Sequence, residues 1–165
     1  MRITLARPLL GFLLIPALTL AGCSAANIDI ATSIKVVQVT TGWFDAGIVN
    51  GKNKLVPSAT SSVSNASAET LSGLQVYSVF RFVGETEELG SSLVVLRGKD
   101  ALGPAAISKP ITVRANWGAT GEQPRAQMLA NRFFQDANVE IFAKFGSAPF
   151  VKVGTAKIAR QLLTQ

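Results

Sequence analysis

The sequence contains no histidine and only one cysteine, Cys23. The lack of histidine excludes Ser-His-Asp and Cys-His nucleophile activation, histidine general bases and most zinc sites. A lone cysteine cannot form an internal disulfide. The sequence also lacks a GxxxxGKS, GxxxxGKT or GxGxxG loop, the usual phosphate cradles of nucleotide-binding proteins. We therefore expect a protein that is not an enzyme and that uses no metal and no cofactor.

The acidic residues leave one catalytic route open, since some hydrolases need only two carboxylates at a suitable separation. Asp45 is the one acid flanked by aromatic residues, but Asp-Ala-Gly is typical of a turn. Glu85, Glu87 and Glu88 cluster after a glycine, where we expect a solvated hairpin tip rather than a calcium site, because DxDxDG spacing is missing. A carboxylate-dependent hydrolase is kept as a remote alternative.

Basic residues outnumber acidic ones, 16 to 10, but they are scattered along the chain. Beyond the N-terminal segment, the basic residues lie at least two positions apart, as Lys52 and Lys54 do. Nucleic-acid-binding arms require denser clusters of Lys and Arg. We therefore expect no nucleic-acid partner.

The N-terminal segment has the features of a secretory signal. Arg2 and Arg7 form a positive n-region, and residues 9–20 are apolar but interrupted by Pro16. This stretch is short for a membrane span, which needs about 20 apolar residues. Small residues follow it, as a signal cleavage site requires.

Leu20-Ala21-Gly22-Cys23 resembles the bacterial lipobox: a branched apolar residue, two small residues and a cysteine. The resemblance implies cleavage between Gly22 and Cys23, a diacylglyceryl group on the Cys23 thiol and often an amide-linked acyl chain such as palmitate. Two or three acyl chains make a durable anchor, at about 0.8 kcal/mol per buried methylene. Ser24, with no aspartate at that position, resembles the outer-membrane sorting pattern. We expect the outer membrane, facing the periplasm, if the cell has two membranes.

This interpretation divides the chain into three parts. Residues 1–22 are the lipoprotein signal peptide, residues 23–32 a lipidated tether and residues 33–165 one domain. The tether consists mainly of small and polar residues and should reach roughly 20 to 30 Å when extended.

The domain has the pattern of an all-β fold. Residues 111–117 alternate strictly between apolar and polar side chains, and residues 139–145 do so with Phe142 as the single exception. We expect an immunoglobulin-like β-sandwich of about seven strands. The expected strands are residues 34–40, 55–65, 74–83, 91–96, 111–117, 139–145 and 150–153.

Turn-forming residues separate these runs, among them Asp45-Ala46-Gly47 and Asn50-Gly51. Pro57 indicates an edge strand or the start of pairing. Residues 124–135 indicate one short helix or a packed loop. The pattern of residues 155–163 fits a strand or a helix.

Residues 63–67 and 71–80 resemble the immunoglobulin-like sandwich families FxLYD and late-embryogenesis-abundant type 14. Those families often have a strand that ends in an Asn turn, a small polar pair and an alternating strand that leads to a glycine turn, here Gly84. The Phe-x-Leu-Tyr-Asp signature itself is absent. The resemblance implies a non-enzymatic envelope domain and assigns no site residues.

Trp43 and Trp117 each lie near a glycine turn at an expected strand end. Core filling is the favoured interpretation, since Trp117 continues the apolar face of its strand. An exposed tryptophan would instead stack on a sugar or contact a protein partner. Arg81 and Arg114 fall on expected outer faces, where we interpret them as solubilising.

The sequence therefore predicts a lipid-anchored cell-envelope protein that docks or supports an envelope protein assembly without catalysis. The alternative is a module that binds peptidoglycan or a surface polysaccharide. The identity of the partner does not follow from the sequence.

Overall fold

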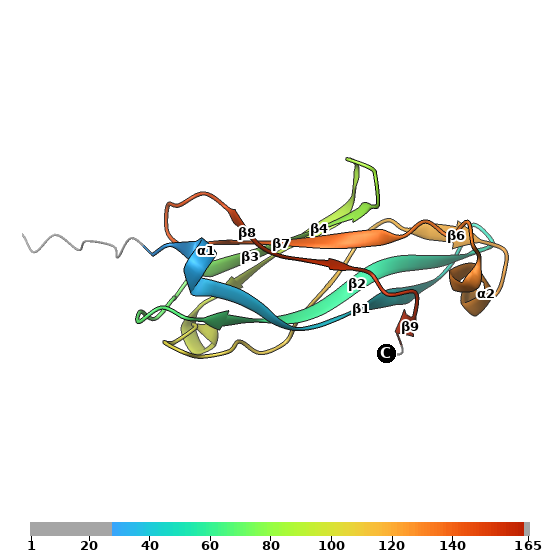
Figure 1. The fold of residues 1–165 in the computed structure, drawn as a ribbon. Coiled ribbons are helices and arrows are strands. Elements are labelled where there is room, and N and C mark those ends of the chain that lie inside the picture. The colour runs from blue at the N-terminus through green and yellow to red at the C-terminus, as the bar shows by residue number, and fades with distance from the viewer. Residues whose placement is uncertain (1–27, 164–165) are drawn as a thin grey trace, which may run out of the picture.

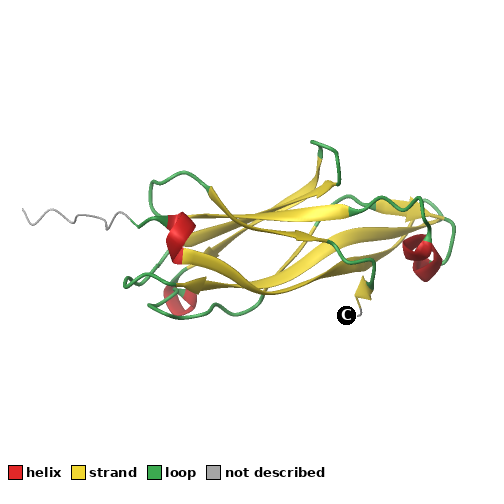
Figure 2. Cartoon of the chain, in the orientation of Figure 1, coloured by secondary structure: helices red, strands yellow, loops and turns green. Residues whose placement is uncertain are grey.

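Residues 28–163 are described in a computed structural model, and they form a β-sandwich of two sheets (Figures 1 and 2). One sheet has the order β5-β2-β1-β9, with β6 also paired to β2, and the other has the order β4-β3-β7-β8. Pairing is antiparallel throughout, except between β1 and β9. The elements are α1 (Ile30–Ser33), β1 (Ile34–Val49), β2 (Lys52–Asn65), β3 (Leu74–Phe82), β4 (Glu88–Leu96), η1 (Gly98–Asp100), β5 (Ile111–Arg114), β6 (Ala119–Gly121), α2 (Arg125–Ala130), β7 (Ala137–Lys144), β8 (Val151–Lys157) and β9 (Leu162–Leu163).

The all-β sandwich predicted from the sequence is confirmed. Each of the seven expected runs overlaps a strand, and α2 lies inside the segment expected to hold a short helix. The short strands β6 and β9 were not expected. Of the ambiguous segment 155–163, the beginning belongs to β8 and the end is β9.

The first two strands form one long hairpin, and this corrects the prediction of a turn at Asp45-Ala46-Gly47. The pairing register shifts between Asp45 and Ile48, so these residues form a bulge inside β1. The hairpin turn is Asn50-Gly51, where φ is 51° and 76°. Positive φ at both positions is the requirement of the two-residue type I′ turn, which favours Asn-Gly.

Pro57 lies in a central strand, not at an edge. Its partner in β1 is Trp43, whose backbone N–H donates to Gln161 O on the side away from β2. The backbone nitrogen and carbonyl oxygen of Pro57 therefore point away from β1, to the side of β2 where β5 and β6 pair. On that side, β5 pairs with residues 58–61 and β6 with residues 53–55, so the missing N–H falls in the gap between them.

The core lies between the sheets and is built from alternating residues. In β7, Ala137, Val139, Ile141 and Ala143 are buried while the residues between them are half-buried. Ile30 in α1 is buried as well, so residues 28–32, assigned above to the tether, pack on the domain. The core of the described residues is built from elements between residues 28 and 163, so a chain that starts at Ser24 contains all of these elements.

The sandwich is elongated and has two distinct ends (Figure 1). We call the end at α1 the near end; η1 and the β7–β8 turn also lie there. The other end, where β6 and α2 lie, is the distal end. The 16 residues of β1 span most of the length, roughly 50 Å at the usual rise per residue. Among the described residues, no helix has the length and apolar character needed to cross a membrane.

Candidate functional site

The two tryptophans that the sequence singles out differ in burial. Trp43 has no exposed surface, and its ring packs edge-on against Phe134 with the centroids 4.7 Å apart. A side chain with no exposed surface cannot stack on a sugar or meet a partner. Trp43 is therefore a core residue, in agreement with the favoured interpretation, and is no longer a candidate contact.

Trp117 is 68% exposed, so the expectation that it fills the core is wrong. The reason is that β5 ends at Arg114, before the alternating pattern reaches Trp117. The backbone N–H of Trp117 donates to Leu89 O in β4 at 2.8 Å, and Lys54 Nζ lies 5.3 Å from the centroid of the Trp117 ring. The backbone around Trp117 therefore runs from the sheet that contains β5 to the edge strand β4 of the other sheet.

Two glycines allow the backbone around Trp117 to pack this closely. A Cβ atom on Gly118 would lie 2.1 Å from Leu55 O, and one on Gly90 would lie 2.6 Å from Asn116 N. Gly90 also has φ of 153°, which side-chain-bearing residues rarely adopt. Trp117 is thus held by close backbone contacts on both sides, rather than on a free loop.

A cavity of about 380 Å³ opens beside the Trp117 ring. Phe82 and Leu89 form its apolar lining together with Trp117. Its remaining lining residues are acidic: Glu85, Glu87 and Glu88. The cavity therefore combines an exposed indole with carboxylates, groups that accept hydrogen bonds and attract cations.

A second cavity, of about 500 Å³, lies next to the first. It is lined by Phe133, which is 77% exposed, and by residues of β6 and the β6–α2 connection. Gln135 lines this cavity and donates to Glu85 of the first cavity at 2.6 Å, so the two share a border. We call the combined area, with Trp117 and Phe133 as its exposed aromatic residues, the distal surface.

Ion pairs hold several of the surrounding charges in place. Arg81 contacts Glu88 at 2.6 Å and Glu140 at 2.8 Å, which joins β3 to both neighbouring strands. Arg114 stacks over the Phe44 ring at 3.6 Å. The sequence suggested that both arginines only solubilise the surface, but their contacts also link strands: Arg81 joins β3 to its two neighbours, and Arg114 reaches from β5 across β2 to β1.

Asp45, the acid flanked by aromatic residues, accepts from Gly47 N at 2.9 Å and forms an ion pair with Arg125 at 2.5 Å. The Arg125 guanidinium, helped by the Gly47 N–H, lowers the pKa of Asp45 below its ordinary value. A carboxyl with a lowered pKa is ionised at neutral pH and is poorly suited to act as a general acid. Within residues 28–163, no group of three or more His, Cys, Asp and Glu side chains is arranged to hold a metal ion.

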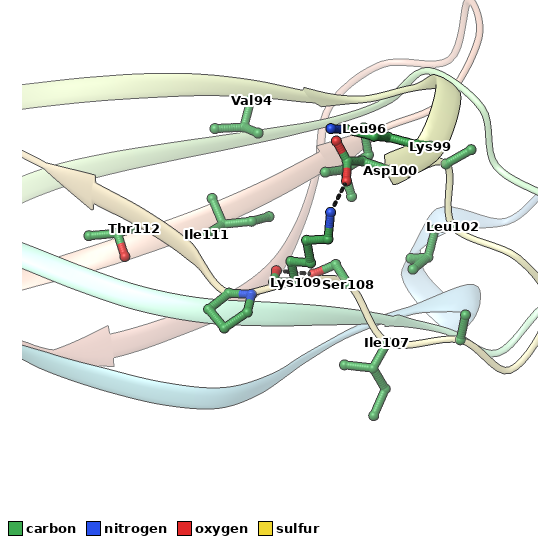
Figure 3. Close-up of a pocket in the computed structure, with 13 residues that line it drawn as sticks. Val94, Leu96, Lys99, Asp100, Leu102, Ile107, Ser108, Lys109, Ile111 and Thr112 are labelled. Carbon is green, nitrogen blue, oxygen red and sulfur yellow. Dashed lines mark hydrogen bonds and ion pairs between the residues drawn. The ribbon is translucent and has the colours of Figure 1, made fainter.

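A third cavity, of about 540 Å³, lies towards the near end in the seam between the edge strands β4 and β5 (Figure 3). Val94 and Leu96 approach it from β4, and Ile111 from β5. Lys109 donates to Asp100 at 2.8 Å across its opening. This hydrogen bond lowers the pKa of Asp100. The seam holds one acid, already paired, so it lacks the two free carboxylates that hydrolysis would need.

The predicted lipidation and cleavage positions, Cys23 and Gly22, lie outside the described residues, as do the signal peptide and residues 23–27 of the tether. Phe133 was missed by the sequence interpretation. It belongs to an Arg-Phe-Phe run in which Phe134 packs on the core, and sequence pattern does not tell which of the two aromatic rings is buried.

No protein-family model matches the sequence, and no curated protein matches it. An X-ray structure of the Northeast Structural Genomics Consortium target SoR45 is similar, with a TM-score of 0.48, 13% identity, and coverage of 79% of this chain and 89% of that chain. The solution structure of AT1g01470 from Arabidopsis thaliana has a TM-score of 0.43 and 12% identity, covering 82% and 85% of the two chains. With scores this low, neither similarity bears on function. The lipobox and FxLYD resemblances stay predictions.

Proposed function

We propose that this protein is a lipid-anchored cell-envelope module that docks a protein partner through its distal surface and performs no catalysis. The observation that carries the proposal is the exposure of Trp117 and Phe133 at the end of the sandwich opposite the N-terminal element α1. Large exposed aromatic side chains in neighbouring cavities are typical anchors of protein interfaces.

The predicted anchor and the fold fit together in this proposal. Lipid on Cys23 would hold the near end close to the membrane, since the packed domain begins within a few residues of it. The distal surface then lies at the other end of β1, roughly 50 Å along the sandwich from the anchored end. In a cell with two membranes, the expected site is the outer membrane, with the domain in the periplasm.

The charges of the distal surface indicate the chemistry of the partner. Glu85 and Glu88 are engaged by Gln135 and Arg81, but Glu87 has no ion-pair partner among the described residues. A partner segment that presents a Lys or Arg beside an apolar side chain would complement this arrangement. We therefore propose a basic, partly apolar segment of an envelope protein as the occupant.

Two features favour binding over catalysis. The absence of histidine removes the commonest general base. In addition, three aspartates form ion pairs. Asp45 pairs with Arg125 and Asp100 with Lys109. Asp136 pairs with both Lys157 and Arg160.

A crosslinking pull-down from intact cells tests the proposal. Tagged wild-type protein is compared with Cys23→Ser and with the double variant Trp117→Ala, Phe133→Ala, and co-purifying proteins are identified by mass spectrometry. We expect a defined envelope protein with the wild type, lost in Cys23→Ser because the anchor is lost. Its recovery should also fall at least about tenfold in the double variant, since each anchor aromatic contributes roughly 1 kcal/mol or more.

Val39→Ala is the matched control, because Val39 is an exposed apolar residue of β1 outside the distal surface. The control should retain the partner. Equal recovery from the double variant and the wild type would overturn docking through the distal surface.

Glycan binding is the second candidate, and exposed Trp117 beside carboxylates is the observation that favours it, because sugars stack on indole and donate to carboxylates. Trp43 can no longer support this candidate. Retention of peptidoglycan fragments without any specific protein, lost in Trp117→Ala, would replace the docking proposal with this one.

A further inference from the structure

The outer face of the sheet β4-β3-β7-β8 carries an apolar row where polar residues are expected. Leu93, Tyr77 and Phe142 are register partners across β4, β3 and β7. The residues on either side of Tyr77 and of Phe142 are buried in the core, so these two rings point to the opposite, outer face. The Phe150 ring lies 5.6 Å from that of Tyr77. We call these four residues the aromatic face.

This face is contiguous and open to solvent. The rings of Tyr77 and Phe142 are 6.4 Å apart, while Leu93 is 52% and Phe150 41% exposed. In an antiparallel sandwich the outer face usually meets water with polar side chains. A contiguous apolar patch there marks a surface that contacts something else.

The aromatic face lies towards the near end. Phe150 precedes β8 in the β7–β8 turn, and α1 packs against β8. Figure 1 shows this turn and α1 at the same end of the sandwich. The face therefore adjoins the point where the chain continues towards Cys23.

The charges of the near end are predominantly basic. Lys144 lies at the rim of the face, with its Nζ 5.6 Å from the Phe150 ring, and neither Lys144 nor Arg97 has an ion-pair partner among the described residues. The other charged residues of the near end lie in β7, at the starts of β1 and β8, and in the loops. The basic residues of this end are Lys35, Arg97, Lys99, Lys109, Lys144 and Lys152, and the acidic ones are Asp29, Glu69, Asp100 and Glu140, of which Asp100 pairs with Lys109 and Glu140 with Lys152.

We propose that the aromatic face and its basic rim rest on the surface of an anionic lipid bilayer and thereby orient the domain. Aromatic side chains flanked by Lys and Arg favour the membrane–water interface, and basic residues are attracted to anionic headgroups. The position beside the anchored end favours a bilayer over a protein as the occupant. The nearness of this end to a membrane rests on the proposed lipid anchor. The affinity of the aromatic face for lipid is a property of the folded domain itself.

The test uses the chain from Ser24 to Gln165, which contains no cysteine, so that Phe150→Cys provides a unique thiol for the polarity-sensitive NBD dye. Vesicles contain phosphatidylcholine alone or with about one-third phosphatidylglycerol. With the anionic vesicles, NBD emission at position 150 should shift to the blue and rise about twofold, as a probe does on entering the interface. The shift should weaken with added salt.

Phe133→Cys is the matched control, because Phe133 is a more exposed aromatic residue at the distal end. Its NBD emission should not change with either vesicle. Arg97→Gln combined with Lys144→Gln should weaken anionic-vesicle binding at least about tenfold, since each basic residue near the surface adds to the attraction.

No emission change at position 150, or equal changes at positions 150 and 133, would overturn the membrane contact. Because the assay contains no partner protein, its failure leaves the pull-down result intact. Conversely, if the pull-down recovers no partner protein, the vesicle result still stands.

Discussion

Replacing Gly118 with alanine should lower the free energy of unfolding by about 3 kcal/mol, near the upper end of the usual cost of overpacking. The new Cβ would lie 2.1 Å from Leu55 O and 2.9 Å from Val56 Cα, and neither backbone atom can rotate away. The segment after β5 would have to move off β2, taking Trp117 with it. Urea unfolding followed by circular dichroism measures the change.

Gly103→Ala is the control for this effect, because a Cβ at Gly103 has no atom within 4 Å. Its stability should stay within about 0.5 kcal/mol of wild type. If Gly118→Ala were equally neutral, the close contact between this segment and β2 would be wrong. Gly118→Ala should also lose the partner in the pull-down even where the protein remains folded, since Trp117 is displaced.

Replacing Asn65 with alanine should lower the free energy of unfolding by a similar amount, about 3 kcal/mol, because buried polar groups lose their partners. Asn65 is buried at the end of β2. Its Nδ2 donates to the carbonyl oxygens of Glu69, Leu102 and Gly103 at 2.7, 3.1 and 3.0 Å. Its Oδ1 accepts from Ser67 N at 2.9 Å. This one side chain therefore ties together two loops of the near end.

Asn65→Asp should be no better than alanine, since it replaces the donor with a carboxylate that faces carbonyl oxygens. Asn138→Ala, at a half-buried asparagine with no side-chain hydrogen bond among the described residues, should change stability by less than about 0.5 kcal/mol. Thermal or urea unfolding of the three variants distinguishes the effects. Equal stabilities for Asn65→Ala and Asn138→Ala would contradict the role of Asn65.

Alternating and β-rich runs were enough to predict seven of the nine strands among the described residues, because one face of each strand must be buried. It also located Asn65 at a strand end, where the FxLYD resemblance implies an Asn turn. Two of the groups that accept hydrogen bonds from Asn65, the carbonyl oxygens of residues 102 and 103, lie far along the chain, and no local pattern reveals them.

The predictions failed where long-range contacts override local pattern. Asp45-Ala46-Gly47 has turn chemistry, yet pairing with β2 continues past it and makes it a bulge. Trp117 continues an alternating pattern, but its backbone leaves β5 because Gly118 packs against β2. In each case the decisive partner is a distant segment.

Phe142, the single exception to alternation in its strand, was the sequence signal for the aromatic face. An isolated exception does not define a surface. Only the register that places Tyr77 and Leu93 beside Phe142 does so.

Site-specific photo-crosslinking in intact cells tests the central claim most directly, that the distal end binds a protein while the near end contacts lipid. A benzophenone amino acid replaces Trp117 in one variant and Phe150 in the other. We expect a defined protein adduct from position 117 and lipid adducts without that protein from position 150. The same protein adduct from position 150, with none from position 117, would contradict it.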